Sequence, residues 1–245
     1  MIATERFLPM RTPDWFNEIN FAFSLKSDGQ MSLKRAPLSV VTANRRRFLQ
    51  ANGLELDSVV AGELVHGSAV KVITLAERGR GAKRTDWIEC VDGLVTAEAG
   101  LLMLTTHADC MPVVVYDAAN RVIGQAHAGW RSLRSGIIEN LITTIRSVNP
   151  ASKSSLYAWV GPTIRACCYP VGEEVARQFP QECRVLVGER IALDLTRFIQ
   201  LEFARLNLDP LAITDSGICT ACDPTFASFR RDGDKTVAMA LVTGL

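Results

Sequence analysis

The sequence is poor in histidine, in net charge and in long hydrophobic runs, and each shortage excludes a class of protein. Its 245 residues include 27 Lys and Arg against 26 Asp and Glu, which leaves a formal net charge of only +1. So small a charge creates no long-range field that would attract nucleic acid or an anionic membrane. No apolar run approaches the length of a membrane span, and the first stretch, MIATERFLPMRTPDWF, carries charges among its apolar residues, unlike a secretory signal. We therefore expect a cytoplasmic protein with no nucleic-acid or membrane partner.

Disulfides, linkers and repeats are not indicated either. The seven cysteines are odd in number and too sparse for a small secreted disulfide scaffold, so we expect reduced thiols. The composition, 48% hydrophobic and 22% charged, is that of an ordinary globular protein with a sizeable core. Because α/β proteins of this length often share one core, we expect residues 1–245 to form a single domain.

Short apolar runs bounded by turn residues predict strands in INFAFS, AVKVITL, GLVT, LLMLTT, PVVVY, VIGQA, LYAWV and VAMALV. The segment DAAN between two of these runs predicts a hairpin. Apolar residues at helical spacing predict a helix from about Ser135 onward. Two more helices are predicted in TANRRRFLQANG, capped by Thr42 and ended by Gly53, and in DLTRFIQLEFARL behind Asp194. The strands are too hydrophobic to have a face in water, which favours an α/β fold with sheets covered by helices.

The three histidines lie near the ends of predicted elements, where side chains can face a cleft. Cys110 precedes the first strand of the hairpin and His127 follows the second, so both return to one end of the sheet. His66, at the end of a predicted strand in ELVHGSAV, would complete a Cys-His-His set. Such a set leaves zinc an open position for water or substrate. An inert buried cysteine with hydrogen-bonded histidines is the alternative interpretation.

The remaining histidine, His107, and the cysteine pair of CTAC also have candidate roles. Strand alternation places His107 on the side of Asp109 and opposite Cys110, so we expect it to support the ligands or contact substrate rather than bind the metal. The segment CTAC, Cys219 to Cys222, has the spacing of zinc knuckles and redox dithiols but lacks a second pair. We expect ordinary thiols there, with a zinc or redox role as the alternative.

Four arginines are candidates for binding an oxyanion. Arg131 follows HAGW just before the predicted helix, whose N-terminal N–H groups also attract anions. Arg230 and Arg231 lie near a turn in FRRDGD. Arg45 belongs to a run of three arginines on a helix, of which most should face solvent, and we expect Arg45 to be the one that faces inward.

Two carboxylates lie beside apolar strand residues, Asp92 in ECVDGLVT and Asp109 in HADC. Burial would force each to find a partner. Either could orient a histidine ligand or exchange a proton, and turn-stabilising or capping roles fit equally well. We take Asp109, together with Cys110 and His127, as the candidate catalytic residues.

These segments, read in order, resemble one known family, the laccase-domain purine nucleoside phosphorylases, formerly regarded as polyphenol or multicopper oxidases. The matching segments cover nearly the whole chain: NRRRFL, VHGSAV, VDGLVT, ADCMPVVVYD, HAGWR, GPTIRACCYPVG and CTACDPTFASFRRDGD. The resemblance implies a single-domain four-layer α/β/β/α sandwich with mixed sheets. It also implies that His66, Cys110 and His127 hold one zinc ion.

The activity that the resemblance implies is phosphorolysis of adenosine, inosine, guanosine or methylthioadenosine to a base and a pentose 1-phosphate, with adenosine deamination beside it. The partners would be a purine nucleoside and phosphate. Phosphate needs cationic groups, for which Arg45, Arg131, Arg230 and Arg231 are candidates. Deamination needs an activated water, which zinc with an open position provides. Copper is not expected, because a four-copper laccase needs roughly ten histidine ligands and this chain has three.

The sequence departs from the family pattern at several places. Leu64 stands where related sequences have Gln, Ser132 where they have Gly, and Pro170 where they have an acidic residue. Thr236 and Val237 replace the usual Gly-Arg. None of these is a predicted metal ligand, so the departures bear on substrate contacts rather than on the metal.

Two other functions fit the same residues. Cys110 could be the nucleophile of a cysteine hydrolase of amide bonds, with a histidine as its base; some relatives are associated with editing of cell-wall precursors. A zinc-stabilised binding module without catalysis is the third hypothesis. Alkylation separates the zinc enzyme from the cysteine hydrolase, because a free thiolate reacts quickly and a zinc-bound one is protected.

Overall fold

The computed structural model describes residues 12–150 and 153–245, which form two large sheets and one small one. The strand orders are β1-β12-β5-β2, β11-β8-β6-β7-β4-β3 and β10-β9. The strands are β1 (Asn20–Phe23), β2 (Val59–Ala61), β3 (Val70–Val72), β4 (Gly93–Thr96), β5 (Leu102–His107), β6 (Met111–Asp117), β7 (Val122–Ala128), β8 (Leu156–Val160), β9 (Arg184–Val187), β10 (Arg190–Leu193), β11 (Ile213–Asp215) and β12 (Met239–Gly244). The α-helices are α1 (Leu38–Ala51), α2 (Trp130–Arg134), α3 (Ile137–Val148), α4 (Glu173–Ala176), α5 (Leu195–Arg205) and α6 (Phe229–Asp232).

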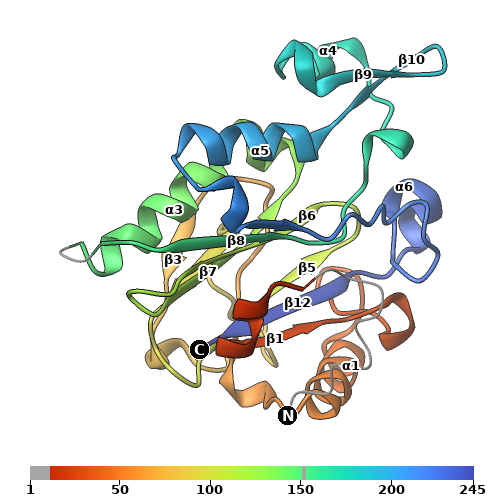
Figure 1. Ribbon diagram of the computed structural model, residues 1–245. Coiled ribbons are helices and arrows are strands. Elements are labelled where there is room, and N and C mark those ends of the chain that lie inside the picture. The colour runs from red at the N-terminus through yellow and green to blue at the C-terminus, as the bar shows by residue number, and fades with distance from the viewer. Residues whose placement is uncertain (1–11, 151–152) are drawn as a thin grey trace.

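The two large sheets lie face to face, and helices cover their outer faces (Figure 1). Three groups of buried side chains fill the spaces between the layers. Val113 and Ile138 belong to the group between the six-stranded sheet and helices α3 and α5. Trp159 lies in the group between the sheets, and Phe48 and Val242 lie between the four-stranded sheet and α1. The layers therefore follow the order α/β/β/α, as the family resemblance implies, and both large sheets are mixed.

The predicted hairpin forms the centre of the six-stranded sheet. Strands β6 and β7 pair antiparallel from Met111 opposite Ala128 to Asp117 opposite Val122, around the turn DAAN. Every residue of both strands is buried, which is why their sequences are nearly continuous apolar runs. The hairpin brings the residue before β6 and the end of β7 to the same edge of the sheet.

The three predicted helices are present, with one difference at a start. The helix α1 begins at Leu38, directly after Pro37, and Thr42 lies inside it rather than at its N-cap. Proline restricts the backbone where a helix starts, and this position overrides the capping preference of threonine. Two other predicted helix boundaries are confirmed. Gly53 follows the end of α1 with a φ of +70°, and the Asp194 carboxylate accepts a hydrogen bond from the Arg197 amide at the start of α5. In the described part of the chain, no helix has both the length and the apolar character that crossing a bilayer requires.

The strands that sequence patterns did not predict are short or exposed. The hairpin β9–β10 projects beside α4 at one end of the molecule (Figure 1). Leu186 in this hairpin is 76% exposed. Because the hairpin buries few side chains, it shows little of the alternation by which a half-buried strand is recognised.

Candidate metal centre and active site

Three side chains from three parts of the chain meet at the edge of the six-stranded sheet. Cys110 directly precedes β6, His127 lies near the end of β7, and His66 lies in the loop between β2 and β3 rather than at a strand end. Their ligand atoms all lie within 4.8 Å of one another. The rings of His66 and His127 are 4.8 Å apart between centroids and nearly perpendicular. The structure therefore brings together the three residues that the sequence predicts as a ligand set.

The glycine after the HA pair of HAGW allows this close approach. A Cβ atom on Gly129 would lie 2.9 Å from the Cys110 Sγ and 3.3 Å from the His66 Cδ2. Real Cβ contacts are essentially never shorter than 3.0 Å, so any side chain here would displace the sulfur. The glycine thus leaves room for the two ligands beside the end of β7.

Asp92, just before β4, holds both histidines in position. Its carboxylate accepts hydrogen bonds from the backbone amides of Val65, His66 and Gly67 at 3.1, 3.0 and 2.7 Å. It also accepts one from the His127 Nδ1 at 2.9 Å. Burial alone would raise the pKa of Asp92, but the contacts with His127 and with these amides lower it below its usual value. Because Nδ1 carries the proton, the Nε2 atom of His127 is the one available to a metal.

The amides of this loop face Asp92 because the backbone at His66 is left-handed, with a φ of +61°. That conformation is uncommon for a residue other than glycine. The three hydrogen bonds to Asp92 are what stabilise it.

The Cys110 thiol and the His127 ring influence each other's ionisation. Burial alone would raise the pKa of Cys110, but the charge of His127 and hydrogen bonds with His127 and His66 lower it to about 6. Burial alone would lower the pKa of His127, but the Cys110 charge and the contact with Asp92 raise it to about 9. Cys110 is therefore a thiolate at neutral pH, the form that binds metals and acts as a nucleophile.

The donor set suits a metal ion. One thiolate and two imidazoles are the ligands that zinc and other borderline-soft divalent ions prefer. Within residues 12–150 and 153–245, no fourth His, Cys, Asp or Glu contributes a ligand atom to this group. An ion held by the three residues would keep a coordination position for water or substrate.

His107 lies beside the three candidate ligands without joining them. Its Nε2 is 2.9 Å from the Thr105 Oγ1, and its Nδ1 is 3.1 Å from the carbonyl oxygen of Cys110. Burial and the neighbouring charge of His127 hold its pKa well below the usual value. His107 is thus a neutral ring that supports the backbone of Cys110.

Asp109, predicted as a catalytic residue, has its carboxylate occupied by structural contacts. Its Oδ1 accepts from the Thr220 hydroxyl at 2.6 Å and its Oδ2 from the Arg230 amide at 2.7 Å. Its backbone has a φ of +81°. Through these contacts Asp109 joins the Cys110 turn to the C-terminal loops, and its catalytic role stays a prediction.

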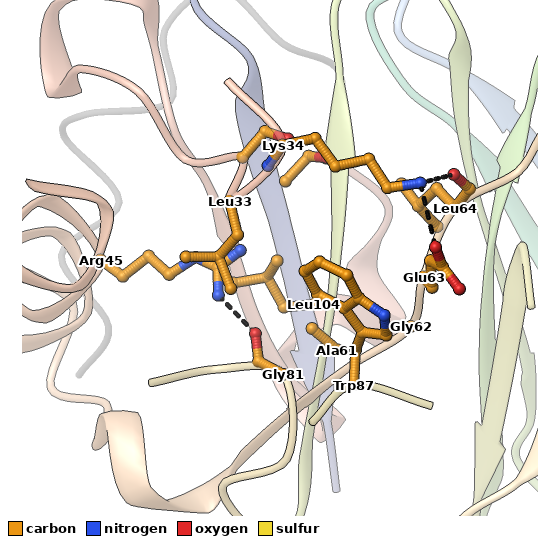
Figure 2. Close-up of a pocket in the computed structure, with 12 residues that line it drawn as sticks. Leu33, Lys34, Arg45, Ala61, Gly62, Glu63, Leu64, Gly81, Trp87 and Leu104 are labelled. Carbon is orange, nitrogen blue, oxygen red and sulfur yellow. Dashed lines mark hydrogen bonds and ion pairs between the residues drawn. The ribbon is translucent and has the colours of Figure 1, made fainter. Parts of the chain in front are cut away.

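Arg45 faces inward as predicted, but its guanidinium is occupied. It is 3% exposed, and burial lowers its pKa to about 10, so it remains charged at neutral pH. The guanidinium donates to the carbonyl oxygens of Met31 at 2.9 and 2.7 Å, of Gly81 at 2.7 Å and of Ala82 at 2.8 Å. Figure 2 shows it reaching from α1 toward Gly81. These bonds give Arg45 a structural role, and its contact with phosphate stays a prediction.

Arg231 is occupied in a similar way. Its guanidinium donates to the carbonyl oxygens of Thr220 at 2.8 Å and Phe226 at 2.6 Å, and it pairs with Asp232 at 2.9 Å. These bonds hold the loop before α6, and the contact of Arg231 with phosphate stays a prediction.

Arg131 and Arg230 remain exposed near the site. The Arg131 guanidinium lies over the Trp130 ring at 4.3 Å, and that of Arg230 lies over the Tyr169 ring at 5.1 Å. Burial and the charge of Cys110 raise the pKa of Tyr169 to about 12, while the charges of both arginines oppose this rise. Tyr169 is therefore close enough to Cys110 and to the two arginines to be influenced by their charges. Sequence reasoning missed it, although it lies within the family segment GPTIRACCYPVG.

A cavity of about 400 Å³ opens onto the three candidate ligands. Leu64 and Ala238 provide apolar lining, and Lys34 and Arg35 provide positive charge. Lys34 donates to the Leu64 carbonyl at 2.8 Å (Figure 2), and Arg35 lies 5.5 Å from the centroid of the Phe229 ring. Sequence reasoning missed both cations, because they lie in a segment without helix or strand periodicity.

Comparisons with known proteins agree with this fold. The model of a family described as multi-copper polyphenol oxidoreductase laccase matches residues 29–245. A protein of Geobacillus stearothermophilus named purine nucleoside phosphorylase YlmD is 32% identical over 214 residues, 83% of this chain and 78% of that protein. The Bacillus subtilis protein of the same name is 29% identical over 84% of this chain and 77% of its own length. The crystal structure of the Geobacillus YlmD superposes with a TM-score of 0.89 at 29% identity, over 95% of this chain and 93% of that one.

Proposed function

The chain belongs to the family described as multi-copper polyphenol oxidoreductase laccase. Because similar proteins are named purine nucleoside phosphorylase, we propose that it is a purine nucleoside phosphorylase, and that it is cytoplasmic and zinc-dependent. Its substrates would be phosphate and adenosine, inosine, guanosine or methylthioadenosine, with adenosine deamination as a second activity. The observation that carries the proposal is the meeting of His66, Cys110 and His127 at a cavity that also bears Lys34 and Arg35.

Zinc rather than copper is the metal that these residues support, despite the family's description. A four-copper oxidase needs roughly ten histidine ligands. The whole sequence has three. When bound by His66, Cys110 and His127, zinc would supply a Lewis acid and a water of lowered pKa.

Phosphate binding falls to the cations around the cavity. In phosphorolysis a phosphate oxygen attacks C1′ of the pentose while the bond from C1′ to the purine nitrogen breaks. The purine leaves with the electron pair and takes up a proton. Lys34 and Arg35 in the lining, together with the exposed Arg131 and Arg230, would hold the phosphate and offset its charge as it approaches the sugar.

The uncharged part of the cavity suits the nucleoside. Leu64 and Ala238 give apolar surface for a purine ring. The volume of about 400 Å³ lies within the range usual for small-molecule sites. In the second activity, water adds to C6 of adenine and ammonia leaves, so this reaction needs the base rather than the sugar near the ligand set. Which nucleoside is preferred would depend on the positions that depart from the family pattern, among them Leu64.

Zinc content and product formation, measured on the same preparations, test the proposal. Mass spectrometry should find zinc in the wild type, and the Cys110→Ala variant should lose about one equivalent because the only thiolate of the set is gone. Chromatography of adenosine incubated with phosphate should show adenine or inosine with the wild type only. The matched control is Cys90→Ser, because Cys90 is an exposed free thiol outside both groups of candidate ligands.

The outcome that contradicts the proposal is specific. Zinc-loaded wild type that releases no base from any purine nucleoside in phosphate would exclude phosphorylase activity. Retention of full activity by Cys110→Ala would exclude the proposed site instead.

A cysteine hydrolase of amide bonds is the second candidate function, and the ionisation of Cys110 favours it. A pKa of about 6 beside a protonated His127 is the state of an activated cysteine nucleophile. In that case iodoacetamide would label Cys110 rapidly in the purified protein, with no change on adding a chelator. Under the zinc proposal, labelling is slow until the chelator removes the metal.

A further inference from the structure

Four of the remaining cysteines form a second group, away from the cavity described above. Cys167 and Cys168 end a 3-10 turn (Ala166–Cys168) after β8, and Cys219 and Cys222 lie in the loop after β11. We refer to these four residues as the cysteine cluster. Their sulfur atoms all lie within 4.8 Å of one another, and none of the four lines the cavity. The expectation that CTAC lacks a second pair is therefore wrong, because the fold supplies that pair from Cys167 and Cys168.

The sulfur positions match a tetrahedral metal site. A zinc ion with Zn–S bonds of about 2.3 Å places its four sulfurs about 3.8 Å apart. In the cysteine cluster, the Cys222 Sγ lies 3.3 Å from that of Cys168 and 3.6 Å from that of Cys167. All four residues are free thiols. The cluster thus has the number, type and spacing of ligands that a closed structural zinc site requires.

Backbone contacts hold the two ligand-bearing loops together without help from a metal. Thr163 and Cys219 form a parallel β-bridge, and the Thr220 amide donates to the Thr163 carbonyl at 3.1 Å. The Arg165 amide donates to the Cys219 Sγ at 3.4 Å. Amide donors to sulfur favour the thiolate, which is the form that binds metal.

The side chain of Arg165 adds a second tie between the loops. Its guanidinium pairs with the Asp215 carboxylate and donates to the Ile218 carbonyl at 3.2 Å. The spacing of the four sulfurs is therefore set by contacts outside the cysteine cluster. Because the ligands are already positioned, binding of an ion costs less conformational entropy.

We propose that the cysteine cluster binds a second zinc ion as a closed four-thiolate site, distinct from the site of His66, Cys110 and His127. The site has no open position, so it holds structure and performs no chemistry. This proposal does not depend on the enzymatic activity proposed above.

The contacts around the cluster indicate what the second zinc stabilises. Cys168 directly precedes Tyr169 and Pro170, and the Pro170 carbonyl accepts from the Arg230 side chain at 2.8 Å. Thr220, between the other two ligands, donates to the Asp109 carboxylate next to Cys110. The second zinc would therefore fix the two loops that hold Arg230 and the Cys110 turn in place.

The number of zinc ions per chain, measured in variants that each remove one of the two metal sites, tests the proposal. Purified wild type should contain about two zinc ions per chain, and both Cys110→Ala and the double variant Cys219→Ser/Cys222→Ser should contain about one. The control Cys90→Ser should contain about two. Equal zinc in the wild type and the double variant would overturn the proposal, as would complete loss of zinc in Cys110→Ala. Neither result depends on turnover, so a failure here is distinct from a failure of the phosphorylase proposal.

Two further measurements keep the test valid if the double variant does not fold. Cys222→His replaces one zinc ligand by another and should retain the second zinc ion. Cobalt added to metal-free wild type should give the intense thiolate charge-transfer absorption of a four-sulfur site, which two histidines and one cysteine cannot reproduce. An intact mass that lacks two hydrogens, with only one zinc bound, would show a disulfide in place of the site. Stoichiometric iron instead of a second zinc would likewise overturn the assignment.

Discussion

Asp92 is the residue through which the two candidate histidine ligands are coupled. One carboxylate accepts from three successive amides around His66 and from the His127 ring. Among the roles that the sequence left open for Asp92, the structure shows two, orienting a histidine and stabilising the loop around His66. The carboxylate fixes the ring of one ligand and the backbone of the other, so the geometry of the pair depends on it.

Replacing Asp92 should weaken metal binding without removing a ligand. We expect Asp92→Ala to lower zinc affinity about 10- to 100-fold, as loss of a partner that orients a ligating histidine does in other metal sites. Competition with a chromogenic chelator measures the affinity. Asp86→Ala is the matched control, because Asp86 is an exposed carboxylate paired with Arg84. An unchanged affinity in Asp92→Ala would show that the histidines are held by other contacts.

The candidate ligands were predictable at the residue scale, and the anion-binding residues were only partly so. His66, Cys110 and His127 stand out because histidine is scarce and because a hairpin returns two of them to one edge. Arg45 and Arg231 carry the same charge as Arg131 and Arg230, but each of their guanidinium groups donates several hydrogen bonds to backbone carbonyls, whereas Arg230 donates one. The whole fold determines where a loop carbonyl points, so a local residue pattern does not predict it.

At the scale of elements, the contact between β7 and α3 keeps the ligand-bearing hairpin in place. Gly124 lies in the middle of β7 against the helix. A Cβ atom there would lie 2.8 Å from the Leu141 Cδ1 and 3.0 Å from the Ile145 Cδ1. The helix can lie this close to the strand only because that position has no side chain.

Adding one methyl group at this contact should destabilise the protein. We expect Gly124→Ala to reduce the free energy of unfolding by about 1–3 kcal/mol through overpacking, measured by urea denaturation. Leu141→Ala should relieve the contact, so the double variant Gly124→Ala/Leu141→Ala should lose less than the sum of the two single changes. Strict additivity would argue against the proposed contact.

Elements with a strong apolar pattern were predictable, and elements defined by tertiary contacts were not. The helix α3 has five buried apolar residues at helical spacing, and β6 and β7 are apolar throughout. The hairpin β9–β10 has few buried residues, and β2 has only three residues altogether. Their strand conformation comes from pairing partners, which a local pattern does not reveal.

At the scale of the whole molecule, the order of the layers follows from the resemblance rather than from periodicity. Periodicity predicts covered sheets, but it does not predict that two sheets stack. The cysteine cluster illustrates the same limit, because its two pairs lie far apart in the sequence and meet only when β8 and β11 become neighbours.

We propose that residues 1–245 form one domain that unfolds as a unit. Each large sheet contributes to two of the three groups of core residues, so no layer can separate without exposing another. Calorimetry of the metal-saturated protein should show one transition with equal calorimetric and van't Hoff enthalpies. Phe48→Ala, in the outermost group of core residues, should destabilise by about 3–5 kcal/mol and shift that whole transition. A second transition, or movement of only part of the first, would indicate separate domains.

The place of β12 in the four-stranded sheet has a consequence for the order of assembly during translation. β12 lies between β1 and β5 and is the only strand that pairs with β1 in the described chain. The strand β1 therefore waits unpaired on the ribosome until residues 239–244 have emerged. The hairpin β6–β7 and its neighbour β8 are complete long before that. The six-stranded sheet can thus begin to form before β12 has been made, whereas the four-stranded sheet closes only after β12 has emerged.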